Sequence, residues 1–448
     1  MNSFPGASRR ASRSASPSAS PGVGTPRARA LPVLETAPAR RGPDRSTDRR
    51  ITLAGLIGAV AFLVAATLSL AVRADARLGL WLPAHLALAG AAGLAIAAML
   101  PFFVAALAVG PPAAPALRVA SLALVASGAV GGVAGRLAAG GGTSTIAAGG
   151  AAAYVAGMTL VGLSAALSLR SASGTRRPVT EAAYAIGLID VLVGVSLVAL
   201  YLAGDPGAAA AWSHLRVAHA WLNLLGFVTL VIAGSLVHFA PTVVGARIRR
   251  RRAGTVAVGC LAIGAPSVAA GYATGTDGVA LIGAVAAVGG AVALVVHGLQ
   301  AHRDRAGWTT DLPWHRYTGG SLIAAPGWLV VATIVAASGI AAHGTEPGSW
   351  RLDRVAAPLI LGFVVQVLLG SVSHLIPAVG AGTPALHARQ RSLLGRAGTL
   401  RVVGWNAGVA LLTVGVLGEL GAVAMAGAAC VLGSGIATLA LVLLSLRG

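Results

Sequence analysis

The sequence contains no lysine and few charged residues of any kind. All 33 basic residues are arginine, and charged residues make up 10% of the chain against 56% for hydrophobic residues. A water-soluble domain carries far more charge than this. The scarcity of charge therefore excludes a soluble protein and indicates a chain that crosses a membrane several times.

Cysteine is almost absent as well. The two cysteines, Cys260 and Cys430, both lie inside apolar runs, and no pair of cysteines or of cysteine and histidine has the spacing of a zinc site. The sequence therefore indicates neither a disulfide framework nor a structural zinc site. The sequence also lacks a P-loop, an HExxH helix and a dinucleotide fingerprint, so it offers no signature of a nucleotide-dependent or protease-like enzyme.

The arginine excess gives a formal net charge of +20, but its distribution indicates membrane orientation and not nucleic-acid binding. Residues 1–50 form an Arg/Ser/Pro-rich tail without an apolar run, which we predict to be disordered and cytoplasmic because it cannot bury a core. Most other arginines fall in loops that share one side of the membrane with this tail. The pattern predicts a bacterial cytoplasmic-membrane protein with its N-terminus and C-terminus both in the cytoplasm.

From Ile51 onward the sequence contains apolar segments that are long enough to cross the hydrocarbon layer, which takes ~20 helical residues. Their approximate limits are 51–72, 79–109, 115–138, 144–168, 181–203, 212–245, 253–273, 278–300, 319–341, 355–380, 400–419 and 421–446. We therefore predict an all-α, polytopic membrane protein with about twelve transmembrane helices, which together form a transmembrane domain over residues 51–448.

One stretch of these segments occurs twice. Residues 225–241 read LGFVTLVIAGSLVHFAP, and residues 361–377 read LGFVVQVLLGSVSHLIP, so that His238 and His374 hold the same place in the two copies. His85 and His219, near the starts of spans two and six, are separated by almost the same interval as these two histidines. We interpret this as an internal repeat of three four-helix units, covering about 51–170, 180–300 and 315–448, with spans two, six and ten as counterparts.

Twelve spans in three units, with histidines on spans two, six and ten, resemble the heme-copper oxidase subunit I superfamily, which includes the NnrS-like membrane proteins. The segment around His219 and His238 also resembles membrane regions of actinobacterial proteins described as copper-oxidase-like. The chain departs from the oxidase pattern in three ways. Span seven has no histidine, span ten has His374 without a second histidine two residues away, and no tyrosine follows a span-six histidine by four residues. The resemblance therefore implies a related fold but not a complete oxygen-reducing centre.

The resemblance and the residues together point to an outer layer of candidate ligands. Arg216, His219 and Asn223 stand at i, i+3 and i+7, on one face of a helix, and His85 occupies the matching place on span two. Two neutral imidazoles can ligate a heme iron or a copper ion. We predict such a site between His85 and His219, with Arg216 binding a heme propionate and Asn223 donating to a bound ligand. The alternative is structural hydrogen bonding by both histidines.

His238 and His374 form a second layer of candidate metal ligands, each three residues before a proline. The alternative is that each hydrogen-bonds a carbonyl group that the proline leaves without a partner. Five other histidines fall in predicted loops or at span ends and are expected to be solvated: His214, His302, His315, His343 and His387. The role of His297, near the inner end of span eight, is left open. Asp190, midway along span five, is a candidate ion or proton site, with a protonated carboxyl that donates one interhelical hydrogen bond as the alternative.

The sequence thus predicts an integral membrane protein that binds heme or copper and is linked to respiration or nitrogen-oxide handling, without being a complete terminal oxidase. The alternatives are a secondary transporter that uses Asp190 as its ion site, and a structural or assembly subunit without a cofactor. The expected partners are the lipid bilayer, other membrane subunits and an electron-transfer partner, and nucleic acid is not among them.

Overall fold

The computed structural model describes residues 46–174, 176–247, 252–305, 313–379 and 382–447. Within these ranges the regular structure is entirely helical, and twelve helices are long and apolar enough to cross a membrane. The predicted all-α, multi-pass architecture is therefore confirmed. The first helix, α1 (Ser46–Ser69), takes in the last residues of the predicted tail, and residues 1–45 of that tail lie outside the described residues.

Three of the twelve spans are much more buried than the others, and we call them the first, second and third central spans. In each of them 78% of an 18-residue apolar window is buried, against values between 28% and 44% for the other nine. The first consists of α2 (Trp81–His85), η1 (Leu86–Ala92) and α3 (Gly93–Leu107); the second of α8 (Trp212–Trp221), η2 (Leu222–Thr229) and α9 (Leu230–Val243); and the third of α14 (Leu352–Val355), η3 (Ala356–Val365) and α15 (Gln366–Val379). These are the spans on which the sequence places its repeated histidines.

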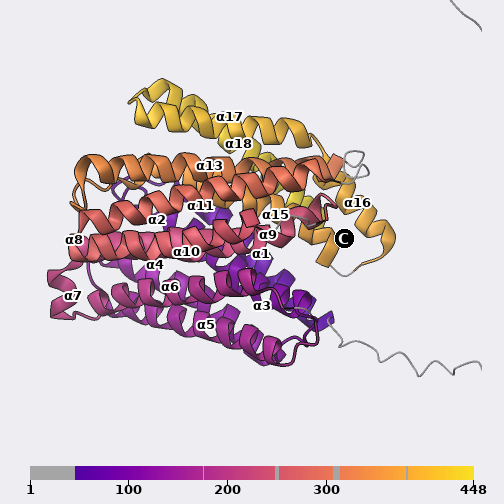
Figure 1. Cartoon of the computed structure of the whole chain (residues 1–448), viewed down its shortest axis with the longest axis horizontal. Helices are drawn as coiled ribbons and strands as arrows, with labels where there is room; N and C mark the ends of the chain where they lie inside the picture. Colours follow the sequence, from indigo (N-terminus) through magenta and orange to yellow (C-terminus); the bar gives the residue numbers. More distant parts are fainter. Residues whose placement is uncertain (1–45, 175, 248–251, 306–312, 380–381, 448) are drawn as a thin grey trace, which may run out of the picture. The chain divides into compact units, whose positions relative to one another are not determined.

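Nine further spans pack around the central ones, and consecutive helices such as α4 and α5 run alongside one another (Figure 1). Their outward apolar side chains, for example Ile282 and Leu400, are exposed, as contact with lipid chains requires. The nine are α1, α4 (Pro115–Ala138), α5 (Thr145–Arg170), α6 (Pro178–Leu202), α10 (Arg252–Thr274), α11 (Asp277–Arg303), α13 (Pro313–His343), α17 (Gly398–Leu417) and α18 (Gly421–Leu446). The shorter helices α7 (Pro206–Ala210) and α16 (Pro384–Gly395) lie between spans.

Each central span contains a π-helical segment, labelled η1, η2 and η3. A fixed interval separates Leu86 and Leu222, the first residues of η1 and η2. The same interval separates Thr229 and Val365, the last residues of η2 and η3. π-Helical turns are rare in proteins as a whole. Where they occur, they are often at functional sites, because the wider turn redirects the side chains beside it. Here η1 follows His85 directly. The equal intervals between the π-helical segments support the predicted three-unit repeat.

Glycines of the repeat allow neighbouring helices to approach the central spans closely. A Cβ atom on Gly226 would lie 2.4 Å from the Asp190 carboxylate oxygen, and one on Gly362 would lie 2.5 Å from the Trp328 ring. No side chain larger than hydrogen fits at either position. These glycines therefore allow close packing of the helices.

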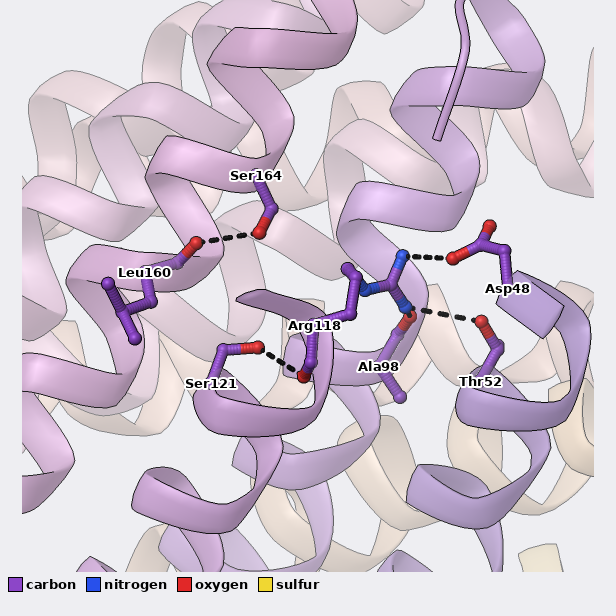
Figure 2. Close-up of polar contacts among 7 residues, drawn as sticks. All are labelled: Asp48, Thr52, Ala98, Arg118, Ser121, Leu160 and Ser164. Atoms are coloured by element: carbon purple, nitrogen blue, oxygen red, sulfur yellow. Dashed lines mark hydrogen bonds and ion pairs between the residues drawn. The ribbon is translucent and has the colours of Figure 1, made fainter. Parts of the chain in front are cut away.

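A buried ion pair ties α1, α3 and α4 together (Figure 2). Arg118, which is 1% exposed, donates from Nη1 to Asp48 at 2.8 Å and from Nη2 to the Ala98 carbonyl at 2.7 Å. A second bond from Nη2 reaches the Thr52 hydroxyl at 3.2 Å. Arg118 is thus a buried helical residue and departs from the general placement of arginines in loops.

Candidate functional site

The starts of the first and second central spans border a cavity of about 730 Å³. All four residues of the predicted outer layer line it: His85, Arg216, His219 and Asn223. The remaining walls come from α4, α5, α6, the loop that precedes α14 and the first residues of α14. The structure therefore brings together residues that are far apart in the sequence and were grouped only by repeat position and helix face.

Hydrogen bonds orient both histidines of the cavity. Nδ1 of His85 lies 2.8 Å from the Trp81 carbonyl oxygen, and Nδ1 of His219 lies 2.8 Å from the Gly194 carbonyl oxygen. A carbonyl oxygen only accepts hydrogen bonds, so each Nδ1 carries the proton and each Nε2 carries the free lone pair. This is the arrangement found in metal-binding histidines, whose second nitrogen donates to a carbonyl or carboxylate.

Asn223 supports His219 from the next turn of the second central span. Its Nδ2 donates to the His219 carbonyl at 2.7 Å. It also lies 3.1 Å from His219 Nδ1, but that nitrogen already donates its proton to Gly194, so the contact is not a hydrogen bond. A Cβ atom on Gly194 would be 2.4 Å from Asn223 Nδ2, which shows how closely α6 presses on this site.

Aromatic side chains complete the walls of the cavity. The Trp81 ring stacks on the His85 ring with a centroid distance of 4.1 Å, so Trp81 holds His85 through both its ring and its carbonyl. Tyr201 and Trp212 stack at 3.9 Å with nearly parallel rings. The sequence reasoning missed these residues; the available signal for Trp81 was its position four residues before His85, on the same helix face.

The cavity carries an excess of positive charge. Its charged lining residues are three arginines, Arg136, Arg216 and Arg351, and one carboxylate, Asp353. Arg351 forms an ion pair with Asp353 at 2.6 Å, and this hydrogen bond raises the pKa of Arg351. Arg136 donates to the Gly142 carbonyl at 2.9 Å and Arg216 to the Pro347 carbonyl at 3.4 Å. These two guanidinium groups therefore line the cavity while they donate to neutral carbonyl groups.

The available metal ligands are few. Among the described residues, no group of three or more His, Cys, Asp or Glu side chains could hold a metal ion. His85 and His219 are the histidines of the cavity lining, and both present an unprotonated Nε2. The site thus offers two imidazole ligands in a space much larger than an ion requires.

The second histidine layer lies elsewhere on the central spans. Neither His238 nor His374 lines the cavity. The histidine that bonds a proline-freed carbonyl is His297 of α11, whose Nε2 lies 3.0 Å from the oxygen of Val237, four residues before Pro241. The carbonyl that Pro241 leaves without a helical partner is therefore bonded by a histidine of another helix, and the roles of His238 and His374 stay predictions.

The His374 ring lies in an aromatic cluster. It packs edge-on against Phe239 with a centroid distance of 5.6 Å, and it lies 6.0 Å from the ring of His315. His315 is 5% exposed within α13, so its expected place in a solvated loop was wrong. The helix begins at Pro313, earlier than the apolar pattern indicated, and buries this histidine.

Asp190 lies outside the cavity, against the backbone of η2. It is 5% exposed on α6, and its Oδ2 has no hydrogen-bond partner among the described residues. The carboxyl group occupies the space that Gly226 leaves open. The sequence prediction of a deeply placed carboxyl group is therefore confirmed for its burial, whereas its role as an ion or proton site stays a prediction.

Comparison with known proteins bears on the fold. A cryo-EM structure of a heme-copper terminal oxidase dimer matches with a TM-score of 0.63 and 13% sequence identity, over 90% of this chain and 84% of that chain. No protein-family model and no curated protein matches the sequence. At this identity the likeness concerns the fold alone. The chain is a twelve-helix integral membrane protein with a heme-copper oxidase-like fold.

Proposed function

We propose that this protein binds a heme between its first and second central spans, with His85 and His219 as the iron ligands. The observation that carries the proposal is that both imidazoles line one cavity and are hydrogen-bonded in the same way. Each donates its Nδ1 proton to a backbone carbonyl at 2.8 Å, which leaves its Nε2 lone pair for a metal.

The size and charge of the cavity favour heme over a copper ion. A volume of about 730 Å³ falls in the range of ~300–1,000 Å³ that organic ligands and cofactors occupy. Three arginines against one carboxylate leave an excess of two positive charges, which matches the two propionates of a heme. Arg216 and Arg136 are the guanidinium groups that we assign to those propionates, because their planar forks suit bidentate binding of carboxylates.

A bound heme supplies one-electron chemistry. In this chain the Trp81 and Gly194 carbonyls orient the two ligands, and aromatic side chains line the cavity around them. We infer a role in electron transfer linked to respiration or nitrogen-oxide handling, in the cytoplasmic membrane of a bacterium. An electron-transfer protein or another membrane subunit is the partner that such a role requires.

The test is an absorption spectrum with iron and copper analysis on the full chain purified in detergent. The wild-type protein should show a heme spectrum and about one iron per chain. His85→Ala and His219→Ala should each remove or convert that spectrum, and His343→Ala, an exposed histidine outside the cavity, should leave it unchanged. A wild-type protein without heme overturns the proposal, and stoichiometric copper in its place overturns the choice of heme.

A secondary transporter is the second candidate, and the state of Asp190 favours it. Its Oδ2 is buried without a hydrogen-bond partner among the described residues, and such intramembrane carboxyl groups often mark ion or proton sites. Asp190→Asn keeps the shape of the side chain and removes the titrating group. If Asp190→Asn abolishes proton-coupled uptake in proteoliposomes and leaves the heme spectrum unchanged, the transporter is favoured. If the variant keeps both the uptake and the heme spectrum, the transporter is excluded.

A further inference from the structure

A second cavity, of about 90 Å³, lies where all three central spans meet. Its lining residues occupy equivalent places in the three spans. The interval that separates His238 from His374 also relates the successive members of two such sets: Met99, Ser235 and Ser371; and Phe103, Phe239 and Leu375. The cavity therefore lies on the axis that relates the three predicted repeat units, and its lining extends the repeat to the first central span.

The cavity is apolar apart from two serine hydroxyl groups. The Ser235 Oγ donates to the Val231 carbonyl at 2.8 Å and pairs with the Tyr184 hydroxyl at 2.9 Å. Its proton is therefore not available to a guest molecule. The Ser371 hydroxyl remains as the other polar group of the lining. A buried water needs about 2–4 polar partners, so this cavity does not offer a stable place for one.

We propose that the cavity on the repeat axis binds a small apolar gas molecule of diatomic size. An engineered apolar cavity of ~150 Å³ in another protein stays dry and binds benzene or xenon. At about 90 Å³ the present cavity is smaller, so it suits a diatomic gas or a xenon atom. The polarizable sulfur of Met99 and the rings of Phe103 and Phe239 provide dispersion contacts.

Its position supports access from the membrane and from the larger cavity. Apolar gases dissolve in lipid hydrocarbon, and the lining runs from the middle of each central span toward its C-terminal end, within the membrane-spanning helices. On the first central span the larger cavity is lined as far as Ala89 and the smaller one from Ala92, so one helical turn separates them. On the second, Val228 and Val231 stand in the same relation. The binding proposal does not depend on the presence of heme.

Xenon is the probe for this site. The full chain is purified in detergent and equilibrated with xenon under pressure, and its structure is determined by cryo-EM or crystallography. We expect a xenon peak between Met99, Ser235 and Ser371. Ala95→Ile fills the cavity and should remove most of that peak, whereas Met99→Ala enlarges the cavity and should raise the occupancy. Ala156→Ile, the same substitution as the first on an exposed face of α5, should leave the occupancy unchanged.

The wild-type map alone can overturn the proposal. A map without xenon at this place, or one with ordered water there, shows that the cavity does not take an apolar gas. An Ala95→Ile variant that keeps the full wild-type peak would equally contradict it. If that variant fails to accumulate, the opposing change expected in Met99→Ala still decides. A protein without heme that binds xenon here would refute the proposed function and leave this inference standing.

Discussion

His297 donates a hydrogen bond from Nε2 to the carbonyl oxygen of Val237 at a distance of 3.0 Å. Val237 precedes Pro241 by four residues, and proline has no N–H group with which to satisfy that carbonyl within the helix. The bond therefore joins α11 to the second central span at the point where Pro241 interrupts the backbone hydrogen bonds of that span. Both groups are buried, so water cannot bond the Val237 carbonyl. The His297 bond takes the place of the missing helical hydrogen bond.

The first prediction concerns this bond. His297→Ala should destabilise the protein by about 1–3 kcal/mol, because it leaves a buried carbonyl group without a partner. Pro241→Ala restores an N–H group in the helix, so the same His297→Ala change should cost less in that background. The measurement is thermal or denaturant unfolding in detergent of the two single variants and the double variant. Strictly additive effects of the two substitutions would show that the proline and the histidine are not coupled.

The second prediction concerns the ion pair of Figure 2. Arg118→Met should destabilise the chain by about 3–5 kcal/mol, because it removes the guanidinium that neutralises the buried Asp48 carboxylate. Adding Asp48→Leu should recover much of that loss, since both charges are then gone. Arg73→Met is the matched control, because Arg73 and Asp75 form an ion pair that is almost fully exposed. It should change stability by no more than about 1 kcal/mol, and an equal loss in the two arginine variants would contradict the assignment.

The third prediction concerns the contact between α6 and the candidate heme ligand. Gly194→Ala should shift Asn223 and His219, because the added Cβ atom would lie 2.4 Å from Asn223 Nδ2. We expect a changed heme spectrum or a shifted reduction potential, with the chain still accumulating in the membrane. Gly149→Ala, at a helical glycine with nothing within 4 Å of the added atom, should leave both readouts unchanged. An unaltered spectrum in Gly194→Ala would show that α6 does not set the position of His219.

The fourth prediction concerns orientation. The arginine distribution predicts that both termini lie in the cytoplasm. Reporter domains that are active only in the cytoplasm should therefore work when fused at either end, and periplasmic reporters should be silent at both. Opposite signals at the two ends would contradict the even number of spans, and periplasmic signals at both would reverse the orientation.

The sequence alone determined the number and approximate limits of the membrane spans. Runs of apolar residues long enough to cross the hydrocarbon layer leave little freedom, since the backbone must form helices there. The repeat spacing also identified spans two, six and ten as counterparts, and the structure shows that these three are the buried spans. In the same way, the equivalent places of His85 and His219 were enough to predict that they share a site.

The tertiary structure decided which partners complete that site. Arg136, Arg351 and the Gly194 carbonyl reach the cavity from separate elements, and no helical periodicity in the sequence connects them with His219. The role of His297 was open for the same reason, since its acceptor lies on another span. Local spacing fixes which side chains share a helix face. Which faces meet depends on how all twelve helices pack, and the close approach at small residues such as Gly194 and Gly226 sets that packing.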